Sequence, residues 1–274
     1  MDIRRITALA DVALVVALQT EVWGAAETVP THEVLVHSRT GGLVLGAYGG
    51  AGDLIGFAYA FPAWQAGAAP WLHSQMVAVR QGARSRGAGF ALKVAQRREA
   101  LAMGYRRITW TYDPLQGPNA NLNIARLGAI ARHYERDVYG AMQDSLNAGL
   151  PSDRVLVEWD LDRARVRARL DQGSVASDPA DLAPSVTPLQ PGGGRWPRIA
   201  ALDLGRGEPE LRVAIPGDFL AMKAADMGLA ADWRAQTRAA LEHYFAAGYA
   251  VVGFARGQAV HHYLLRAGGD PFAR

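Results

Sequence analysis

The chain has 274 residues, of which half are hydrophobic and 20% are charged, a balance that excludes a disordered chain and allows a sizeable core. Its 29 Lys and Arg residues exceed its 26 Asp and Glu residues by three, and the basic residues are scattered along the sequence. Such charge suits a small anionic ligand better than a nucleic acid, whose binding signatures the sequence lacks. The chain contains no cysteine, which excludes disulfides, thiolate nucleophiles and thiolate metal sites.

The N-terminal part of the sequence predicts a strand, a helix and a glycine-rich hairpin. Residues 3–6 have a strand-like pattern, and residues 9–22 have apolar side chains at helical spacing. Residues 43–48 and 54–59 are expected to pair as antiparallel strands. Because glycines interrupt the apolar stretch 43–61, we expect a hairpin there and no membrane span. With no apolar signal region at the N-terminus, we expect a cytoplasmic protein without a membrane partner.

The next stretch predicts a strand, a short turn and a long helix. Residues 72–79 form the expected strand, and residues 87–103 form the expected helix. The helix is expected to place Phe90, Val94 and Leu101 on one face.

The turn between this strand and helix has the composition of a phosphate-binding turn. Small residues at Gly87, Ala88 and Gly89 let backbone N–H groups approach an anion at the start of the helix, where the helix dipole also favours negative charge. Arg84 and Arg86 add positive charge to the same turn. An ordinary turn before a helix is the alternative.

Spacing excludes two better-known phosphate motifs. A P-loop would require Lys and then Ser or Thr after Gly87, where the chain has Ala88 and Gly89. A dinucleotide fingerprint that begins at Gly87 would require a third glycine at Leu92. The pattern that remains is Arg-x-x-Gly-x-Gly after a strand.

The rest of the chain predicts a strand at 107–112, a helix that begins near Asn119 and a strand at 155–161. Residues 172–197 are rich in Pro, Gly, Ser and Asp, which indicates a linker or long exposed loop. Beyond it the sequence predicts further elements: a strand at 211–215, a helix at 231–247 and strands at 249–254 and 261–265.

At Arg84, Gly87 and Gly89 the chain resembles the GNAT superfamily of acyl-CoA N-acyltransferases, in which Gln/Arg-x-x-Gly-x-Gly/Ala holds the pyrophosphate of coenzyme A. It is also similar to a group of uncharacterised bacterial GNAT-related proteins with a C-terminal extension. This wider likeness is carried by short motifs, namely Leu72-His73-Ser74, Ala91-Leu92-Lys93, Trp110-Thr111-Tyr112-Asp113-Pro114-Leu115, Asn119-Ala120-Asn121 and Leu127-Gly128-Ala129.

The resemblance and the order of the predicted elements imply an α/β (α+β) fold with a GNAT-like mixed, mostly antiparallel central sheet flanked by helices, and a small C-terminal α/β lobe. We expect residues 1–165 to form the acyl-CoA-binding domain, residues 166–200 a linker or long exposed loop, and residues 201–274 the lobe.

The resemblance also implies where the coenzyme binds. In the superfamily a bulge in the strand before the phosphate turn supplies a backbone donor to the thioester oxygen, and the corresponding stretch is Gln75 to Val77. Asn119 and Asn121 resemble a coenzyme-contacting asparagine, although both could instead cap a helix. The expected coenzyme-binding residues are Met76, Val77, Val79, Arg84, Arg86, Gly87, Ala88, Gly89, Asn119 and Asn121.

Acyl transfer to an amine requires a base that removes a proton from the ammonium. His73 is the first candidate, because strand alternation is expected to place it on one face with Gln75 and Val77, near the thioester. A structural, hydrogen-bonded His73 is the alternative. Glu21 is a second candidate, with a solvated helix-end carboxylate as its alternative.

The acid that protonates the departing thiolate is less clearly indicated. The superfamily often has a tyrosine on the helix after the strand that contains Trp110, but Asn123 or Ile124 falls near that position here. Tyr134 is among the nearest tyrosines and is the candidate, with water as the alternative.

Two other patterns suggest ligands. Arg234 and Arg238, at i and i+4 on a predicted helix, could grip an acceptor carboxylate or simply form a solvated face. His261 and His262 are adjacent on a predicted strand and point to opposite sides, so we expect no metal site.

The expected activity is transfer of an acetyl or succinyl group from acyl-CoA to a small amine, by direct attack in a ternary complex. Relatives of the resembled group sit beside amino-acid racemases in some bacteria, which implies an amino acid as acceptor. The alternative is a non-catalytic CoA-binding or structural module. No nucleic-acid partner is expected, and homodimer formation is left open.

Overall fold

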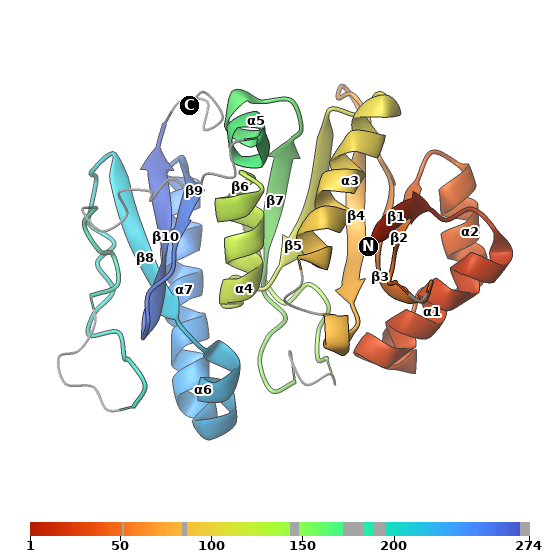
Figure 1. The fold of residues 1–274 in the computed structure, drawn as a ribbon. Coiled ribbons are helices and arrows are strands. Elements are labelled where there is room, and N and C mark those ends of the chain that lie inside the picture. The colour runs from red at the N-terminus through yellow and green to blue at the C-terminus, as the bar shows by residue number, and fades with distance from the viewer. Residues whose placement is uncertain (51, 84–86, 143–147, 172–182, 189–194, 269–274) are drawn as a thin grey trace. The chain divides into compact units, whose positions relative to one another are not determined.

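The computed structural model describes residues 1–50, 52–83, 87–142, 148–171, 183–188 and 195–268 (Figure 1). Contacts divide the chain into two compact units, Met1–Trp110 and Thr111–Arg274. The first unit contains, in chain order, β1 (Asp2–Arg5), α1 (Leu9–Trp23), η1 (Ala25–Glu27), α2 (Thr31–Arg39), β2 (Leu43–Tyr48), β3 (Leu54–Ala63), β4 (Trp71–Val79), η2 (Gln81–Ala83), α3 (Ala88–Ala102) and most of β5 (Arg107–Tyr112).

The strands of the first unit lie in the order β1-β2-β3-β4-β5. Neighbouring strands from β1 to β4 are antiparallel, whereas β4 and β5 are parallel. A parallel pair needs a crossover connection, and α3 is that crossover. The described chain between β1 and β2 also forms α2, which the sequence pattern does not reveal.

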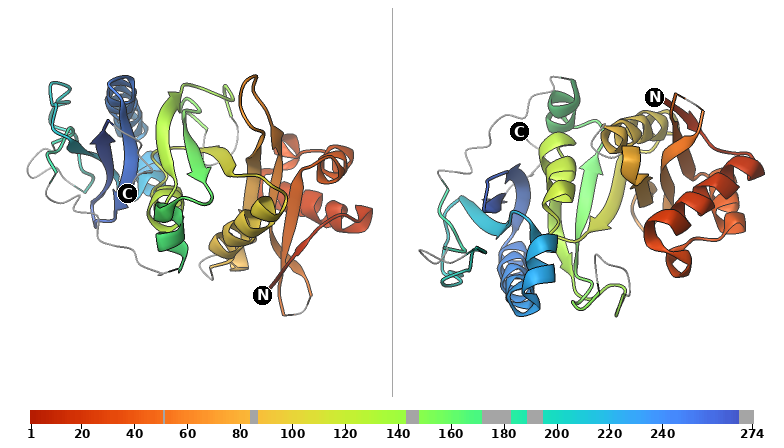
Figure 2. Two further views of the ribbon diagram at one scale, coloured as in Figure 1. Left: turned by 90° about the horizontal axis from the view of Figure 1, so that it is seen from above. Right: turned by 60° about the horizontal axis from the view of Figure 1, so that its bottom comes forward.

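Helices cover both faces of these strands (Figure 2). On one face the core joins α1 and α2 to the sheet through a cluster that includes Val12, Leu18, Val34, Phe57 and Tyr59. On the other face α3 approaches β3 so closely that a Cβ on Gly56 would lie 3.3 Å from a Leu92 methyl carbon.

Helix α3 begins at the predicted position but turns a different face to the core. Phe90, Val94 and Leu101, the expected apolar face, are only half-buried. The fully buried side chains of α3 are Ala88, Leu92, Lys93, Ala95, Gln96 and Ala100. Two polar residues of this helix, Lys93 and Gln96, therefore face the sheet.

The second unit contains, after the end of β5, α4 (Gly117–Ala120), the short π-helix η3 (Asn121–Arg126), β6 (Ile130–Glu135), β7 (Arg154–Asp160), α5 (Ala164–Asp171), β8 (Glu210–Pro216), α6 (Phe219–Ala225), α7 (Met227–Ala246), β9 (Tyr249–Ala255) and β10 (Val260–Ala267). Its strands lie in the order β7-β6-β9-β10-β8, and every pair is antiparallel. Together the two units have the predicted class, strands that are mostly antiparallel with one parallel pair, flanked by helices, and that prediction is confirmed.

The C-terminal strands continue the sheet that β6 and β7 begin. Ala131 of β6 pairs with Val251 of β9, so the residues expected to form a separate lobe share a unit with β6 and β7. Within the expected linker, Ser185 bridges to Arg212 and Val186 is fully buried. Division into an acyl-CoA-binding domain, a linker and a lobe stays a prediction.

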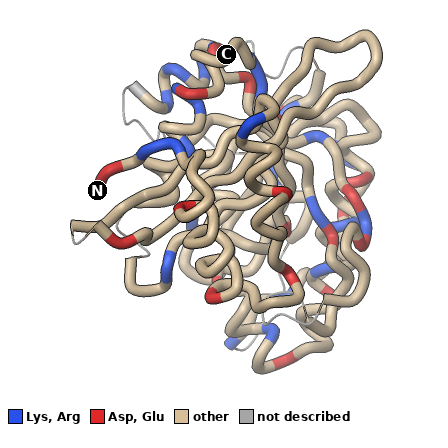
Figure 3. Tube along the Cα trace, turned by 90° about the vertical axis from the view of Figure 1, so that its right-hand side faces the viewer, with Lys and Arg blue, Asp and Glu red and all other residues tan. Residues whose placement is uncertain are grey.

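Basic and acidic residues are interspersed along the described trace, as the sequence suggests (Figure 3). Among the helices of the described residues, none combines the length and the apolar character needed to cross a bilayer.

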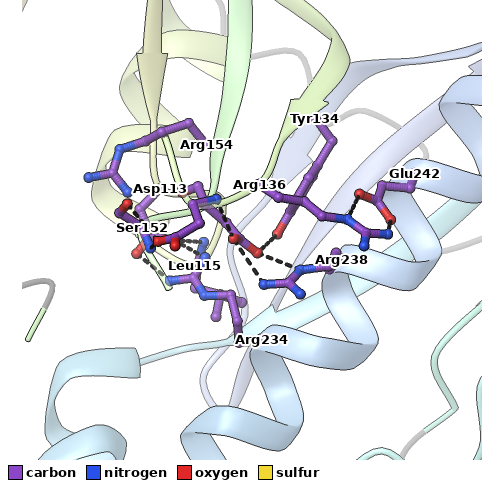
Figure 4. Close-up of polar contacts among 11 residues, drawn as sticks. Asp113, Leu115, Tyr134, Arg136, Ser152, Arg154, Arg234, Arg238 and Glu242 are labelled. Atoms are coloured by element: carbon purple, nitrogen blue, oxygen red, sulfur yellow. Dashed lines mark hydrogen bonds and ion pairs between the residues drawn. The ribbon is translucent and has the colours of Figure 1, made fainter. Parts of the chain in front are cut away.

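A buried ion pair ties α7 to the turn that follows β5. Both guanidinium NH₂ groups of Arg234 donate to the Asp113 carboxylate, over 2.7 and 2.6 Å, and the two side chains are 4% and 7% exposed (Figure 4). Burial alone would lower the pKa of Arg234, but its hydrogen bonds to Asp113 outweigh burial and raise that pKa. Asp113 also accepts from the Leu115 backbone N–H, so one carboxylate fixes the turn and the helix together.

We predict that Arg234→Met lowers the free energy of unfolding by about 3–5 kcal/mol, because it leaves the Asp113 carboxylate buried without its partner. Urea denaturation measures the change. Arg136→Gln is the matched control: its guanidinium pairs with Glu242 at an exposed position, and its loss should change stability little. Equal losses in the two variants would contradict the prediction.

Candidate functional site

Strand β4 contains one residue more than its partner at the centre of the β3–β4 pair. Phe61 pairs with His73 and Tyr59 pairs with Met76, so two residues of β4, Ser74 and Gln75, lie opposite a single residue of β3. This is a β-bulge, which bends a strand and leaves backbone groups outside the regular ladder. It lies in and beside the stretch where the resemblance implies a bulge.

The bulge reverses the alternation of side chains along β4. His73 and Met76 pair with Phe61 and Tyr59, which lie on the α1 and α2 face of the sheet. Val77 pairs with Ala58 and therefore lies on the opposite face. The expectation that strict alternation places His73 and Val77 on one face is wrong, because it counted no extra residue between them.

Strands β4 and β5 part next to the bulge. In the described residues their parallel pairing covers two positions, Leu72 with Ile108 and His73 with Thr109. The bulge residues Ser74 and Gln75 follow the second pair directly. The described β4–β5 pairing therefore ends where the bulge begins.

A buried lysine from α3 reaches the same point. Lys93 Nζ donates to Ser74 Oγ over 2.8 Å and to Gln96 Oε1 over 3.0 Å. The same atom lies 3.7 Å from the centre of the Trp110 ring on β5. Burial lowers the pKa of Lys93 well below its ordinary value.

His73 is held by neighbours on its own face of the sheet. Its Nδ1 lies 3.1 Å from Thr109 Oγ1, which also accepts the Trp71 indole N–H over 3.0 Å. The His73 ring is 5.5 Å from that of Phe61, centre to centre. Burial, with a smaller contribution from Lys93, lowers the pKa of His73 below its ordinary value.

The N-terminus of α3 has no cap among the described side chains. Gly87 is its N-cap residue, with φ +79°, a conformation that favours glycine, and no described side chain caps the helix. A Cβ at Gly87 would meet no atom within 4 Å, and one at Gly89 would come only as near as 4.0 Å to Val79. Backbone N–H groups at an open helix start fit a phosphate group.

The other expected coenzyme contacts are distributed as follows. Arg84 and Arg86 lie outside the described residues. Met76, Val77 and Val79 are each half-buried, and Ala88 is fully buried. Val77 and Val79 share the α3 face of β4, whereas Met76 lies on the other face.

Glu21 lies near the end of α1, where Arg80 Nε donates to both of its carboxylate oxygens, over 3.2 and 3.0 Å. The two side chains are largely exposed. Glu21 is therefore an ion-paired carboxylate at the surface of the first unit, and a catalytic role for it stays a prediction.

In the second unit, Tyr134 donates its hydroxyl to Asp153 over 2.6 Å (Figure 4). Arg238 donates to both oxygens of the same carboxylate, over 2.8 and 3.0 Å. Burial, followed by the contacts with Asp153, raises the pKa of Tyr134. Burial would also raise the pKa of Asp153, but the hydrogen bonds from Arg238 and Tyr134 outweigh it and lower that pKa.

Arg234 and Arg238, the two arginines that could bind an acceptor carboxylate, are both in ion pairs within the chain. Arg234 binds Asp113 and Arg238 binds Asp153, so both guanidinium groups are paired with carboxylates of the chain itself. Asn119 and Asn121 lie at the end of α4 and the start of η3, and the N-cap of α4 is Gln116. Neither asparagine is the N-cap of α4, although Asn121 is its C-cap residue, and their coenzyme contacts stay predictions. No group of three or more potential metal ligands occurs among the described residues.

Sequence reasoning missed Lys93, Ser74 and Thr109. A signal for Lys93 exists: it is next to Leu92 and three residues before Gln96, on a helix whose fully buried residues include small and apolar ones. Ser74 gives no such signal, because its part in the bulge depends on pairing with β3.

We predict that the His73 ring titrates below pH 6.5 and is neutral at pH 7. Since the pKa of His73 is lower in the folded protein than in the unfolded chain, the unfolded chain binds the proton first as the pH falls. His73 therefore lowers the free energy of unfolding as the pH falls through 6.5 and below. NMR titration of the His73 ring, assigned with His73→Gln, measures the midpoint. A midpoint at or above 6.5 would contradict the prediction.

Comparison with models of protein families finds no match, and neither does comparison with curated proteins. Solved structures do match. An aminoglycoside 6'-acetyltransferase type Ii is 15% identical, with a TM-score of 0.47, over 59% of this chain and 97% of its own. A putative acetyltransferase from Salmonella typhimurium, solved with acetyl-CoA, is 19% identical, with a TM-score of 0.47, over 59% of this chain and 94% of its own.

A phosphinothricin acetyltransferase of the GNAT superfamily from Sinorhizobium meliloti, in complex with acetyl-CoA, is 16% identical, with a TM-score of 0.44, over 57% of this chain and 86% of its own. From β1 to β7 the described elements include those predicted, in the predicted order, together with α2 and β6, which were not predicted. The order of the elements that were predicted is the one that the resemblance to the GNAT superfamily implies.

Proposed function

We propose that the protein is an acyl-CoA-dependent N-acyltransferase, which moves an acetyl or succinyl group from CoA to a small amine by direct attack in a ternary complex. The observation that carries the proposal is the bulge of β4 at Ser74 and Gln75, at the point where β4 parts from β5. An open, glycine-capped helix start follows the same strand. β4 would therefore connect a thioester-binding position at its bulge with a phosphate-binding position at the start of α3.

The phosphate end of the coenzyme would bind at the start of α3. No described side chain caps the backbone N–H groups at the start of α3, and the helix dipole favours an anion there. From this point the pantetheine arm would follow the face of β4 that carries Val77 and Val79. It would reach the bulge with its thioester.

At the bulge, backbone N–H groups outside the ladder would donate to the thioester oxygen as negative charge develops on it. Holding donor and acceptor together contributes about 7–11 kcal/mol toward lowering the barrier. The amine nitrogen forms a bond to the carbonyl carbon, the carbon–sulfur bond breaks, and CoA leaves as the thiol after protonation.

His73 is the proposed base, and its tautomer is set by Thr109. Thr109 Oγ1 has two lone pairs, one of which accepts the Trp71 indole N–H. When the second accepts the His73 Nδ1–H, the lone pair of Nε2 is free to take a proton from the acceptor ammonium. The lowered pKa of His73 keeps its ring neutral at pH 7, as a base requires.

The reversed alternation supports a ternary complex. His73 lies on the face of the sheet opposite to Val77 and Val79. The acceptor would therefore approach the gap from the His73 face while the coenzyme follows the other face, so that neither must leave before the other binds. Direct attack needs that arrangement. Roles for Glu21 as an alternative base and Tyr134 as acid remain predictions.

We predict that Gly89→Leu weakens CoA binding at least tenfold without loss of stability, because leucine is a better helix former than glycine but covers the N–H groups at the start of α3. Isothermal titration calorimetry with CoA measures the affinity, and thermal denaturation measures the stability.

Gly228→Leu is the matched control, since Gly228 holds the same second position in α7, whose N-terminus Asp226 caps. It should leave CoA affinity unchanged. Full affinity in Gly89→Leu would show that α3 does not hold the phosphates.

We predict that His73→Gln lowers the rate of amine-dependent thiol release about 10²–10⁴-fold while CoA affinity stays unchanged, because only proton removal is lost. The assay follows thiol release from acetyl-CoA and succinyl-CoA with a mixture of amino acids. If the wild-type protein binds CoA but releases no thiol with any amine, the protein is a CoA-binding module and the proposed activity is wrong.

A further inference from the structure

Lys93 occupies a place where an apolar residue would stabilise the fold more simply. Its side chain is 3% exposed, and it lies on the face of α3 that meets the sheet. Its contacts at Nζ are neutral: a hydroxyl oxygen, an amide oxygen and an indole ring. Burial of an amine without a carboxylate partner costs free energy, which a leucine or methionine would avoid.

The contacts of Lys93 lie where β4 and β5 part. Ser74, which accepts its hydrogen bond, is the first residue of β4 after the last β4–β5 pair, and it belongs to the bulge. Trp110, whose ring it contacts, is the first residue of β5 after the same pair. One amino group thus contacts both strands at the first position beyond their pairing.

Gln96 holds that amino group in place. It lies three residues after Lys93 on α3, and its Oε1 accepts a hydrogen bond from Nζ over 3.0 Å. A long lysine side chain has much rotational freedom, and this second contact restricts it. The contact with Ser74 is therefore made from a fixed point on α3.

We propose that Lys93 is a positioning residue, which acts through Ser74 to hold the β4 bulge and the gap between β4 and β5 in the form that receives the acyl thioester. The inference rests on the proposed function and assigns a residue to the acyl end of that site. The start of α3, which would hold the phosphates, lies more than one helical turn before Lys93 and does not depend on its amino group.

The test uses Lys93→Met, which keeps a long unbranched side chain and removes the amino group. Amide hydrogen exchange followed by mass spectrometry should show about five- to tenfold faster exchange in peptides that cover Gln75 and Met76, the change expected for loss of one hydrogen bond. Exchange in β2 should not change. The thermal midpoint should stay equal or rise, because a buried amine has been removed.

The second measurement compares CoA with acetyl-CoA by calorimetry. Wild-type protein should bind acetyl-CoA about fivefold more tightly than CoA, through one hydrogen bond from the bulge to the thioester oxygen. Lys93→Met should lose this difference while its affinity for CoA itself stays unchanged. A residue that only fills space would not alter the ratio of the two affinities.

Arg98→Met is the matched control, because it removes a positive charge from the 69% exposed Arg98 side chain on the same helix. It should change neither exchange nor the affinity ratio. Ser74→Ala should reproduce the effects of Lys93→Met, and the double variant should show no further loss.

The outcomes separate this inference from the proposed function. If wild-type protein binds neither CoA nor acetyl-CoA, the proposed function fails and this inference fails with it. If it binds both, the inference alone is overturned by equal wild-type affinities, by an unchanged affinity ratio in Lys93→Met, or by unchanged exchange at Gln75 and Met76.

Discussion

The extra residue in β4 is the constraint on which the rest of the first unit depends. A regular β4 would pair with β3 throughout and would keep His73 and Val77 on the same face. With one residue inserted, the two lie on opposite faces, and the ladder is interrupted next to the last β4–β5 pair. The same insertion therefore leaves backbone groups outside the ladder and, in the proposed function, gives the two reactants separate faces of the sheet.

Arg234 and Lys93 both bury a basic group, and the structure offsets the free-energy cost of that burial in two different ways. Arg234 is paired with a carboxylate, and its hydrogen bonds raise its pKa despite burial. Lys93 has neutral partners, and burial lowers its pKa. Removing either partner of the Arg234–Asp113 pair would leave a buried charge unpaired, which strongly lowers the free energy of unfolding. The second arrangement holds an amino group in the core through two hydrogen bonds to neutral oxygens, which suits a residue that fixes geometry more than one that adds stability.

The helices and strands around the candidate site could be predicted from the sequence, but the geometry of the site could not. The strand before Gly87 and the helix after it could be predicted, because glycine at a helix start and apolar spacing are local properties. The bulge was implied only by the family resemblance and not by the residues themselves, since it exists as a register difference between β3 and β4. The burial of Lys93 and Gln96 was missed for a related reason: their partners, each other and Ser74, are brought together only when the helix meets the sheet.

The arginine pair of α7 shows what spacing along one helix can and cannot determine. Two arginines at i and i+4 indicate that carboxylates lie beside the helix, and carboxylates are what the structure places there. The spacing does not show which carboxylates these are, because Asp113 and Asp153 lie far from the helix in sequence. Because these guanidinium groups are already neutralised, a carboxylate on the acceptor would have to displace an internal ion pair to bind them. Recognition of the acceptor is therefore better sought on the His73 face of β4, where the half-buried rings of Phe61 and His73 lie side by side.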